Sequence, residues 1–164
     1  MESSATAALW FLPFVTPIAI WAALSDLSTM KIPNKTVLSL MAVYLLIGLI
    51  VFPLPEYGLR MTHFLVVLLI GFLLNMTGLL GAGDAKFAAA MAPFIAASDV
   101  SFALMLLAIC ILLGFASHRL ARRTAPIRRL TPDWESWTQD KQFPMGYPLA
   151  ITLLAYLFMT AFPG

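Results

Sequence analysis

Long apolar stretches alternate with short polar ones along the whole chain. Most of the apolar stretches approach the roughly 20 residues that a helix needs to cross the hydrocarbon core of a bilayer. The pattern predicts an all-α polytopic membrane protein with about six transmembrane helices, folded as a single membrane-embedded domain over residues 1–164. The expected helices cover about residues 5–24, 37–52, 62–80, 85–97, 101–117 and 147–162.

The composition supports a membrane protein. Hydrophobic residues make up 61% of the chain and charged residues only 11%, whereas a soluble domain carries roughly a quarter charged residues. The first apolar stretch follows Met1-Glu2-Ser3-Ser4, which lacks the basic residues of a signal peptide, so we expect this stretch to remain as a span. A single cysteine, Cys110, can form neither an internal disulfide nor a cysteine-based zinc site.

Basic residues lie almost entirely on one side of the predicted membrane. When the loops are assigned alternately to the two sides, nine basic residues fall on one side and only Arg60 on the other. Because loops rich in Lys and Arg stay in the cytoplasm, we expect both termini outside and the opposite loops inside. The nine are Lys31, Lys35, Lys86, Arg119, Arg122, Arg123, Arg128, Arg129 and Lys141.

Two aspartates stand next to the apolar stretches. Asp84 lies in Gly81-Ala82-Gly83-Asp84-Ala85-Lys86, where it suits the N-cap of the following helix, although an acid at the end of a membrane span usually has a function. Asp26 opens a polar stretch, residues 26–34, at the end of the first apolar segment. A carboxylate there would face the negative end of a helix dipole, so capping does not explain it.

The segment after Asp84 is short for a membrane span. Fifteen residues from Asp84 to Ser98 rise only about 22 Å, against a hydrocarbon core of about 30 Å. If Asp99 lies at the outer surface of the membrane, this short segment places Asp84 inside the membrane, below its cytoplasmic surface. A carboxylate at that depth needs water and protein around it. We therefore expect a cavity that is open to the cytoplasm.

The residues around both aspartates resemble motifs of the prepilin peptidases. These are GxGD-type membrane aspartic peptidases. One similar motif is Asp26 with Lys-Ile-Pro-Asn at residues 31–34, and the other is Gly-x-Gly-Asp-x-Lys around Asp84. The similarity is closest to the short form that serves tight-adherence (Flp-type) pili. Residues 143–148 resemble a third, weaker Pro/Gly motif. The motif residues, and so the candidates for substrate binding, are Lys31, Pro33, Asn34, Gly81, Gly83, Lys86, Pro144 and Gly146.

This resemblance implies a hydrolase of the bacterial inner membrane whose active site faces the cytoplasm. Prepilin peptidases remove a short basic leader from the precursors of type IV pilins and pseudopilins, in pilus assembly and protein secretion. The implied catalytic pair is Asp26 and Asp84. The implied partners are a prepilin-like precursor and the lipid bilayer, with no nucleic acid. Longer members carry a methyltransferase domain with paired cysteines, so N-methylation is not expected of this chain.

Two carboxyl groups suit peptide hydrolysis without a cofactor. One takes a proton from water while the other protonates the departing amine, and two carboxyls that hold one proton between them do both. We expect no metal or other cofactor, because the chain has only two histidines and they fall on opposite sides of the predicted membrane. Gly81 and Gly83 would let a substrate backbone approach Asp84, and the chemistry assigns no role to the other motif residues.

Two other functions remain open at this point. In a transport or channel subunit, Asp26 and Asp84 would relay protons or cations. A relay must connect both sides of the membrane, yet both acids are expected on one side, and the second, fifth and sixth spans carry no acid or base in their cores. A non-catalytic scaffold for pilus assembly would tolerate the topology, but it gives no reason for two acids in turns marked by Gly and Pro.

The longest predicted loop covers about residues 118–145 and is strongly basic. Pro132 after Thr131 favours a short helix that starts there, with Trp134 and Trp137 on one face. One interpretation is a segment at the membrane interface, held by its tryptophans and by attraction of the arginines to anionic lipid. The other is a solvated basic loop that only fixes the topology.

Overall fold

The computed structural model describes residues 2–139 and 142–163, and the described part of the chain is helical without strands. The prediction of an all-α polytopic membrane fold is confirmed. Four helices are long and apolar enough to cross a bilayer, namely α1, α2, α3 and α5, and α7 is a shorter apolar helix. The α-helices are α1 (Glu2–Thr29), α2 (Asn34–Val51), α3 (Leu54–Met76), α4 (Ala82–Met91), α5 (Val100–Arg123), α6 (Ala125–Leu130) and α7 (Gly146–Ala161).

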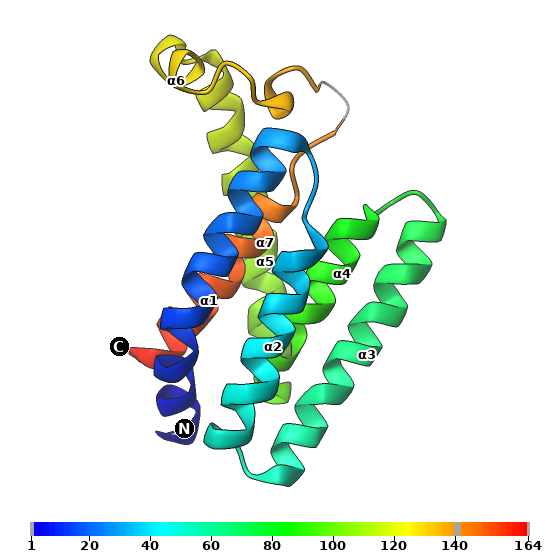
Figure 1. Ribbon diagram of the computed structural model, residues 1–164, viewed down its shortest axis with the longest axis vertical. Coiled ribbons are helices and arrows are strands. Elements are labelled where there is room, and N and C mark those ends of the chain that lie inside the picture. The colour runs from blue at the N-terminus through cyan, green and yellow to red at the C-terminus, as the bar shows by residue number, and fades with distance from the viewer. Residues whose placement is uncertain (1, 140–141, 164) are drawn as a thin grey trace.

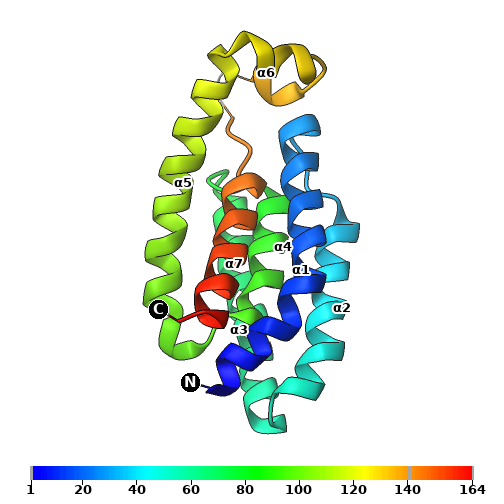
Figure 2. The same ribbon diagram turned by 90° about the vertical axis from the view of Figure 1, so that its left-hand side faces the viewer.

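The long helices form one bundle (Figures 1 and 2). The most extensive contacts join α1 to α7 and α3 to α4, and α5 packs on the outer side of α7. The start of α1 and the end of α7 lie together at the lower end in Figure 1. The C-terminal end of α1 and the N-terminal ends of α4 and α7 point to the other end, which we call the aspartate end. Helix α6 lies across this end, beyond the bundle.

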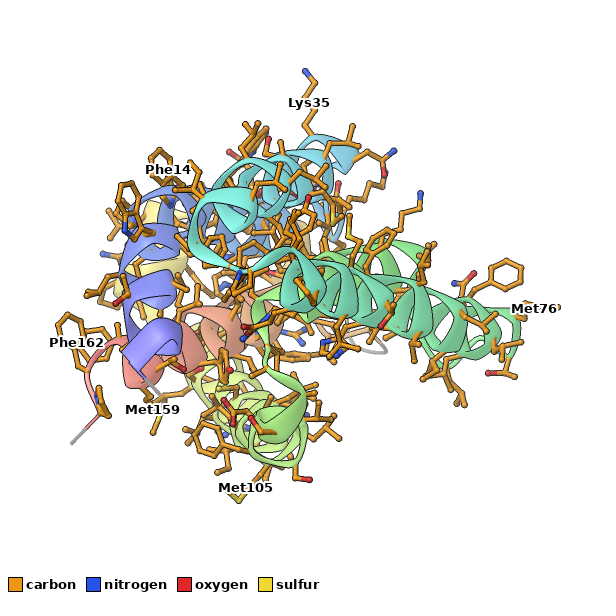
Figure 3. All side chains as sticks on the ribbon, turned by 90° about the horizontal axis from the view of Figure 1, so that it is seen from below. Phe14, Lys35, Met76, Met105, Met159 and Phe162 are labelled. Carbon is orange, nitrogen blue, oxygen red and sulfur yellow. The ribbon has the colours of Figure 1, made fainter. Side chains whose placement is uncertain are left out.

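One face of α1 carries a regular stripe of buried side chains. Small and apolar residues recur every three or four positions, which places them on one side of a helix. The opposite face exposes large apolar side chains, among them Phe14, which points away from the bundle in Figure 3 and suits contact with lipid. The stripe consists of Ala7, Phe11, Val15, Ala19, Ala22 and finally Asp26. The periodicity that buries the apolar side chains therefore also aims Asp26 into the bundle.

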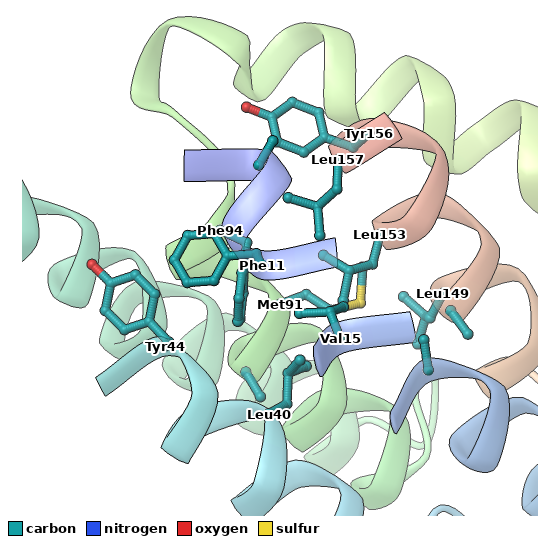
Figure 4. Close-up of a cluster of buried hydrophobic side chains, with 14 of the residues drawn as sticks. Phe11, Val15, Leu40, Tyr44, Met91, Phe94, Leu149, Leu153, Tyr156 and Leu157 are labelled. Carbon is teal, nitrogen blue, oxygen red and sulfur yellow. The ribbon is translucent and has the colours of Figure 1, made fainter. Parts of the chain in front are cut away.

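Aromatic side chains fill the centre of the bundle (Figure 4). Phe11 of α1 meets Phe94 edge to face, with ring centroids 4.8 Å apart, and Tyr44 of α2 packs against the same Phe94 ring at 5.6 Å. Phe94 belongs to η1 (Ala92–Phe94), a 3-10 turn that follows α4. Edge-to-face aromatic pairs add stabilisation to the burial of their area. This cluster joins α1 and α2 to the end of α4.

Helix α4 differs from the helix predicted over residues 85–97. It begins at Ala82 with Gly81 as its N-cap and ends at Met91. The expectation that Asp84 is the N-cap is wrong, because Asp84 is the third residue of the helix. Pro93 lacks an N–H and clashes with a continuing α-helix, which explains the 3-10 turn that follows.

Other helix boundaries also differ from the prediction. Helix α1 continues to Thr29, so Asp26 lies inside a helix and not in a polar stretch after it. Helix α3 begins at Leu54, eight residues before the predicted start, because Pro55 fits the first turn of a helix. Arg60 is consequently buried in α3 at 4% exposure, where it pairs with Glu56 at 2.8 Å.

The basic loop contains less helix after Thr131 than predicted. Helix α6 ends at Leu130, and a 3-10 turn, η3 (Glu135–Trp137), replaces the helix expected from Pro132. Trp134 and Trp137 do share one face, since their rings stack with centroids 5.4 Å apart. Lys141, one of the nine basic residues, lies outside the described residues.

The contact between α3 and α4 depends on Gly71. A Cβ atom at this position would lie 2.9 Å from the Cβ of Ala85, which is next to Asp84. We expect Gly71→Ala to lower the free energy of unfolding by about 1–3 kcal/mol through overpacking. Thermal denaturation in detergent measures the change. Unfolding is detected by a thiol-reactive dye, which reacts with the buried Cys110 only when the protein opens.

Gly58→Ala is the matched control on the same helix. A Cβ atom at Gly58 meets nothing within 4 Å, so this change should leave stability unchanged or raise it by up to about 1 kcal/mol. Equal melting temperatures for the Gly71 and Gly58 variants would show that α3 does not depend on close approach to α4.

Candidate active site

Asp26 is held at the aspartate end by the start of the last helix. Its side chain is 4% exposed, and its Oδ2 atom accepts a hydrogen bond of 2.6 Å from the backbone N–H of Gly146. A Cβ atom at Gly146 would lie 3.0 Å from this same oxygen and 2.9 Å from the side chain of Ile32. Position 146 is therefore crowded by the carboxyl that it binds, which explains a glycine there.

The turn between α1 and α2 carries the Lys-Ile-Pro-Asn motif. Met30 adopts a left-handed conformation with φ of 53°, and its N–H donates to the Asp26 carbonyl at 2.9 Å, which ends α1. The Ser25 hydroxyl donates to the Lys31 carbonyl at 3.0 Å and holds the turn. Pro33 is the N-cap of α2 in an extended conformation, as suits a residue whose φ is fixed. The turn thus folds back beside Asp26.

Asp84 lies in the first turn of α4 and is half-buried. Its carboxyl group turns back towards the backbone N–H of Gly81. An acid at the third position of a helix often reaches back to the N-cap N–H in this way. A Cβ atom at Gly81 would lie only 2.5 Å from Asp84 Oδ2. A side chain at position 81 would therefore meet the Asp84 carboxyl, which explains a glycine there.

The two sequence motifs meet although they are about fifty residues apart. Lys86 Nζ donates to Asn34 Oδ1 at 3.4 Å, which gives both residues a contact that the sequence did not predict. A Cβ atom at Gly83 would lie 3.5 Å from Cβ of Ile32, so α4 packs directly on the turn after α1. These contacts bring the start of α4 next to the end of α1.

A cavity of about 790 Å³ opens between these elements, and both aspartates line it. The two carboxyl groups also lie close enough to interact electrostatically. Of the predicted motif residues, five line the cavity, whereas Pro33, Pro144 and Gly146 do not; Pro144 is fully buried. The five are Lys31, Asn34, Gly81, Gly83 and Lys86.

Sequence reasoning missed part of the cavity wall. Asn75 lines it from α3, and its Nδ2 atom donates to the Leu80 carbonyl at 2.8 Å, which shapes the segment before Gly81. Gln142, Phe143 and Met145 contribute from the segment before α7. The position of Phe143 and Met145 inside the third Pro/Gly motif was the only signal for this second group.

The arrangement places two carboxyl groups around one cavity. Asp26 is buried and anchored through one oxygen, while Asp84 is half-exposed to the same cavity. Among the described residues, no group of three or more His, Cys, Asp or Glu side chains is placed to hold a metal ion. Two adjacent carboxyl groups can exchange one proton and act as an acid and a base.

Comparison with known proteins supports one reading of this site. Neither the proteins of curated function nor the solved structures contain a match. Residues 13–117 match the type IV leader peptidase family, and this segment includes Asp26, the Lys-Ile-Pro-Asn turn and the whole Gly-x-Gly-Asp-x-Lys motif. Because the match covers more than half of the sequence and both aspartates of the cavity, the chain belongs to the type IV leader peptidase family.

Proposed function

We propose that this protein is an aspartic endopeptidase that removes the leader peptide from prepilin-like precursors, with Asp26 and Asp84 as the catalytic pair. The observation that carries the proposal is the cavity that both aspartates line at one end of the bundle. Family membership supports a protease of the leader-peptidase type. It favours this function over the transport subunit and the scaffold that the sequence left open.

The proposed reaction uses one proton held between the two carboxyl groups. The ionised carboxylate takes a proton from water as the water oxygen attacks the carbonyl carbon of the scissile peptide bond. The other, protonated carboxyl then gives its proton to the departing nitrogen as the C–N bond breaks. A positioned acid or base contributes typically 10²–10⁴-fold to such a step. Gly146 binds one oxygen of Asp26, which leaves the other oxygen free for the cavity.

Family membership also supports a multi-pass location in the bacterial inner membrane, and we propose that the cavity faces the cytoplasm. Eight of the nine basic residues on the predicted inner side lie in described segments near the aspartate end, which fits the positive-inside rule. The substrate would be a pilin or pseudopilin precursor of a type IV or tight-adherence pilus. Its leader, which would stay in the cytoplasm, would then approach the aspartates directly.

The proposed orientation is tested with a reporter fused after Gly164. Alkaline phosphatase, which is active only outside the cytoplasm, should be active there and inactive when inserted into the basic loop after Pro132. The reason is the asymmetry of basic residues between the two ends of the bundle. The reverse pattern would place the aspartates outside and contradict the proposed cleavage site.

Loss of either carboxyl should abolish the proposed reaction. We expect Asp26→Asn and Asp84→Asn each to reduce leader removal by about 10²–10⁴-fold, because an amide neither takes nor gives the required proton. Leader removal is read from the gel mobility of a co-expressed precursor. Asp133→Asn, at an exposed position outside the cavity, is the control and should cleave normally. Full processing by both cavity variants would refute the two-aspartate mechanism.

Gly146→Ala tests whether the anchor of Asp26 matters for cleavage. The added Cβ would lie 3.0 Å from both Cβ and Oδ2 of Asp26, so the carboxyl must shift and its hydrogen bond to position 146 is disturbed, and catalytic rates are sensitive to such misplacement. We expect a folded protein with strongly reduced cleavage, checked by the Cys110 melting assay and by precursor processing. Gly58→Ala again serves as the matched control. Normal cleavage by Gly146→Ala would mean that Asp26 needs no anchor.

A further inference from the structure

Five arginines surround a second cavity, which is separate from the site above. It has a volume of about 780 Å³ and lies where α5 meets α6. Among the described residues, no Asp or Glu lines it. Like charges that line one cavity repel each other, so an anion bound among them lowers the electrostatic energy. The arginines are Arg119, Arg122, Arg123, Arg128 and Arg129.

Helix α5 is long enough to carry the arginine cavity to the level of lipid phosphates. Helix α5 exposes large apolar side chains along its length, such as Leu104 at 62% and Leu112 at 70%, which suits a lipid-facing helix. Twenty residues of helix from Val100 rise about 30 Å and end at Arg119. A span that enters the hydrocarbon core at Val100 would therefore leave it at Arg119, the first arginine of the cavity.

Exposed apolar side chains border the arginines on the same segment. Leu120 is 69% exposed, Ile127 39% and Leu130 83%. Helix α6, which carries two of these side chains and two of the arginines, lies across the end of the bundle (Figures 1 and 2). Apolar residues next to cationic ones are typical of segments that lie in the membrane interface. A segment that only stays in water would gain nothing from exposing these leucines.

We propose that this arginine cavity binds the headgroup of an anionic phospholipid. The planar guanidinium group forms paired hydrogen bonds with phosphate oxygens, which makes arginine well suited to this ligand. The lipid chains would then run beside the exposed leucines and along α5.

The test uses native mass spectrometry of the full-length protein in detergent. It measures which added lipids stay bound to the protein. Phosphatidylglycerol should bind more tightly than phosphatidylcholine, because only the first carries a net negative charge. Removing two charges in Arg128→Gln/Arg129→Gln should weaken phosphatidylglycerol binding by about tenfold or more. Lys35→Gln removes an exposed charge that does not line the cavity and that points outward at the edge of the molecule in Figure 3, so it should leave binding unchanged.

Three results would overturn the proposal. The first is equal retention of both lipids by the unchanged protein, and the second is undiminished phosphatidylglycerol binding by the double variant. The third is displacement of the lipid by an equal concentration of inorganic phosphate, which would indicate a site for free anions. If the double variant keeps its lipid but no longer cleaves precursor, the arginines contact the substrate instead. The Cys110 melting assay verifies that each variant is folded.

Discussion

The hydrogen bond from Gly146 to Asp26 links the first helix of the bundle to the last. A buried carboxyl needs a partner in a membrane protein, and the first N–H groups of a helix have none within the helix. The N–H of Gly146, at the start of α7, donates to the Asp26 carboxyl, so both groups gain a hydrogen-bond partner. This contact joins residues 120 positions apart and sets how α1 and α7 meet at the aspartate end, where the rest of their interface is apolar packing. The cavity beside Asp26 depends on that packing.

Polar contacts also fix the opposite end of the bundle. Arg60 pairs with Glu56, donates to the Phe94 carbonyl and lies over the Phe52 ring, so a charge that would be costly alone is fully surrounded. Tyr156 of α7 donates to Asp99 at 2.8 Å and accepts from the N–H of Ala96. These bonds tie α3, α7 and the start of α5 to the turn after α4. The position of Asp84 at the other end of α4 is thereby constrained as well.

The sequence predicted the helices and the two aspartates because apolar periodicity and charge are local signals. It misplaced the end of α1, since the hydroxyls of Ser28 and Thr29 fold back onto the Ser25 carbonyl, so these polar side chains do not interrupt the helix. The end of an apolar stretch indicates where a helix leaves the apolar environment. It does not indicate the last residue of the helix. The Gly146 contact has no local signal at all, because it depends on how two distant helices pack. The same holds for the meeting of Lys86 with Asn34.

Helix α3 is fixed much more firmly at one end than at the other. Arg60 and His63 bind it to the turn after α4 through the carbonyls of Phe94 and Ile95, and Gly71 packs on Ala85. Beyond Gly71 the side chains of Leu73, Met76 and Leu79 are mostly exposed, and Met76 lies at the far edge of the molecule in Figure 3. Segments with few buried contacts open at the lowest cost. The cavity wall that follows α3 is therefore attached to the less firmly held end of this helix. Local opening of that end would move the cavity wall as well, into the lipid that surrounds an exposed apolar helix.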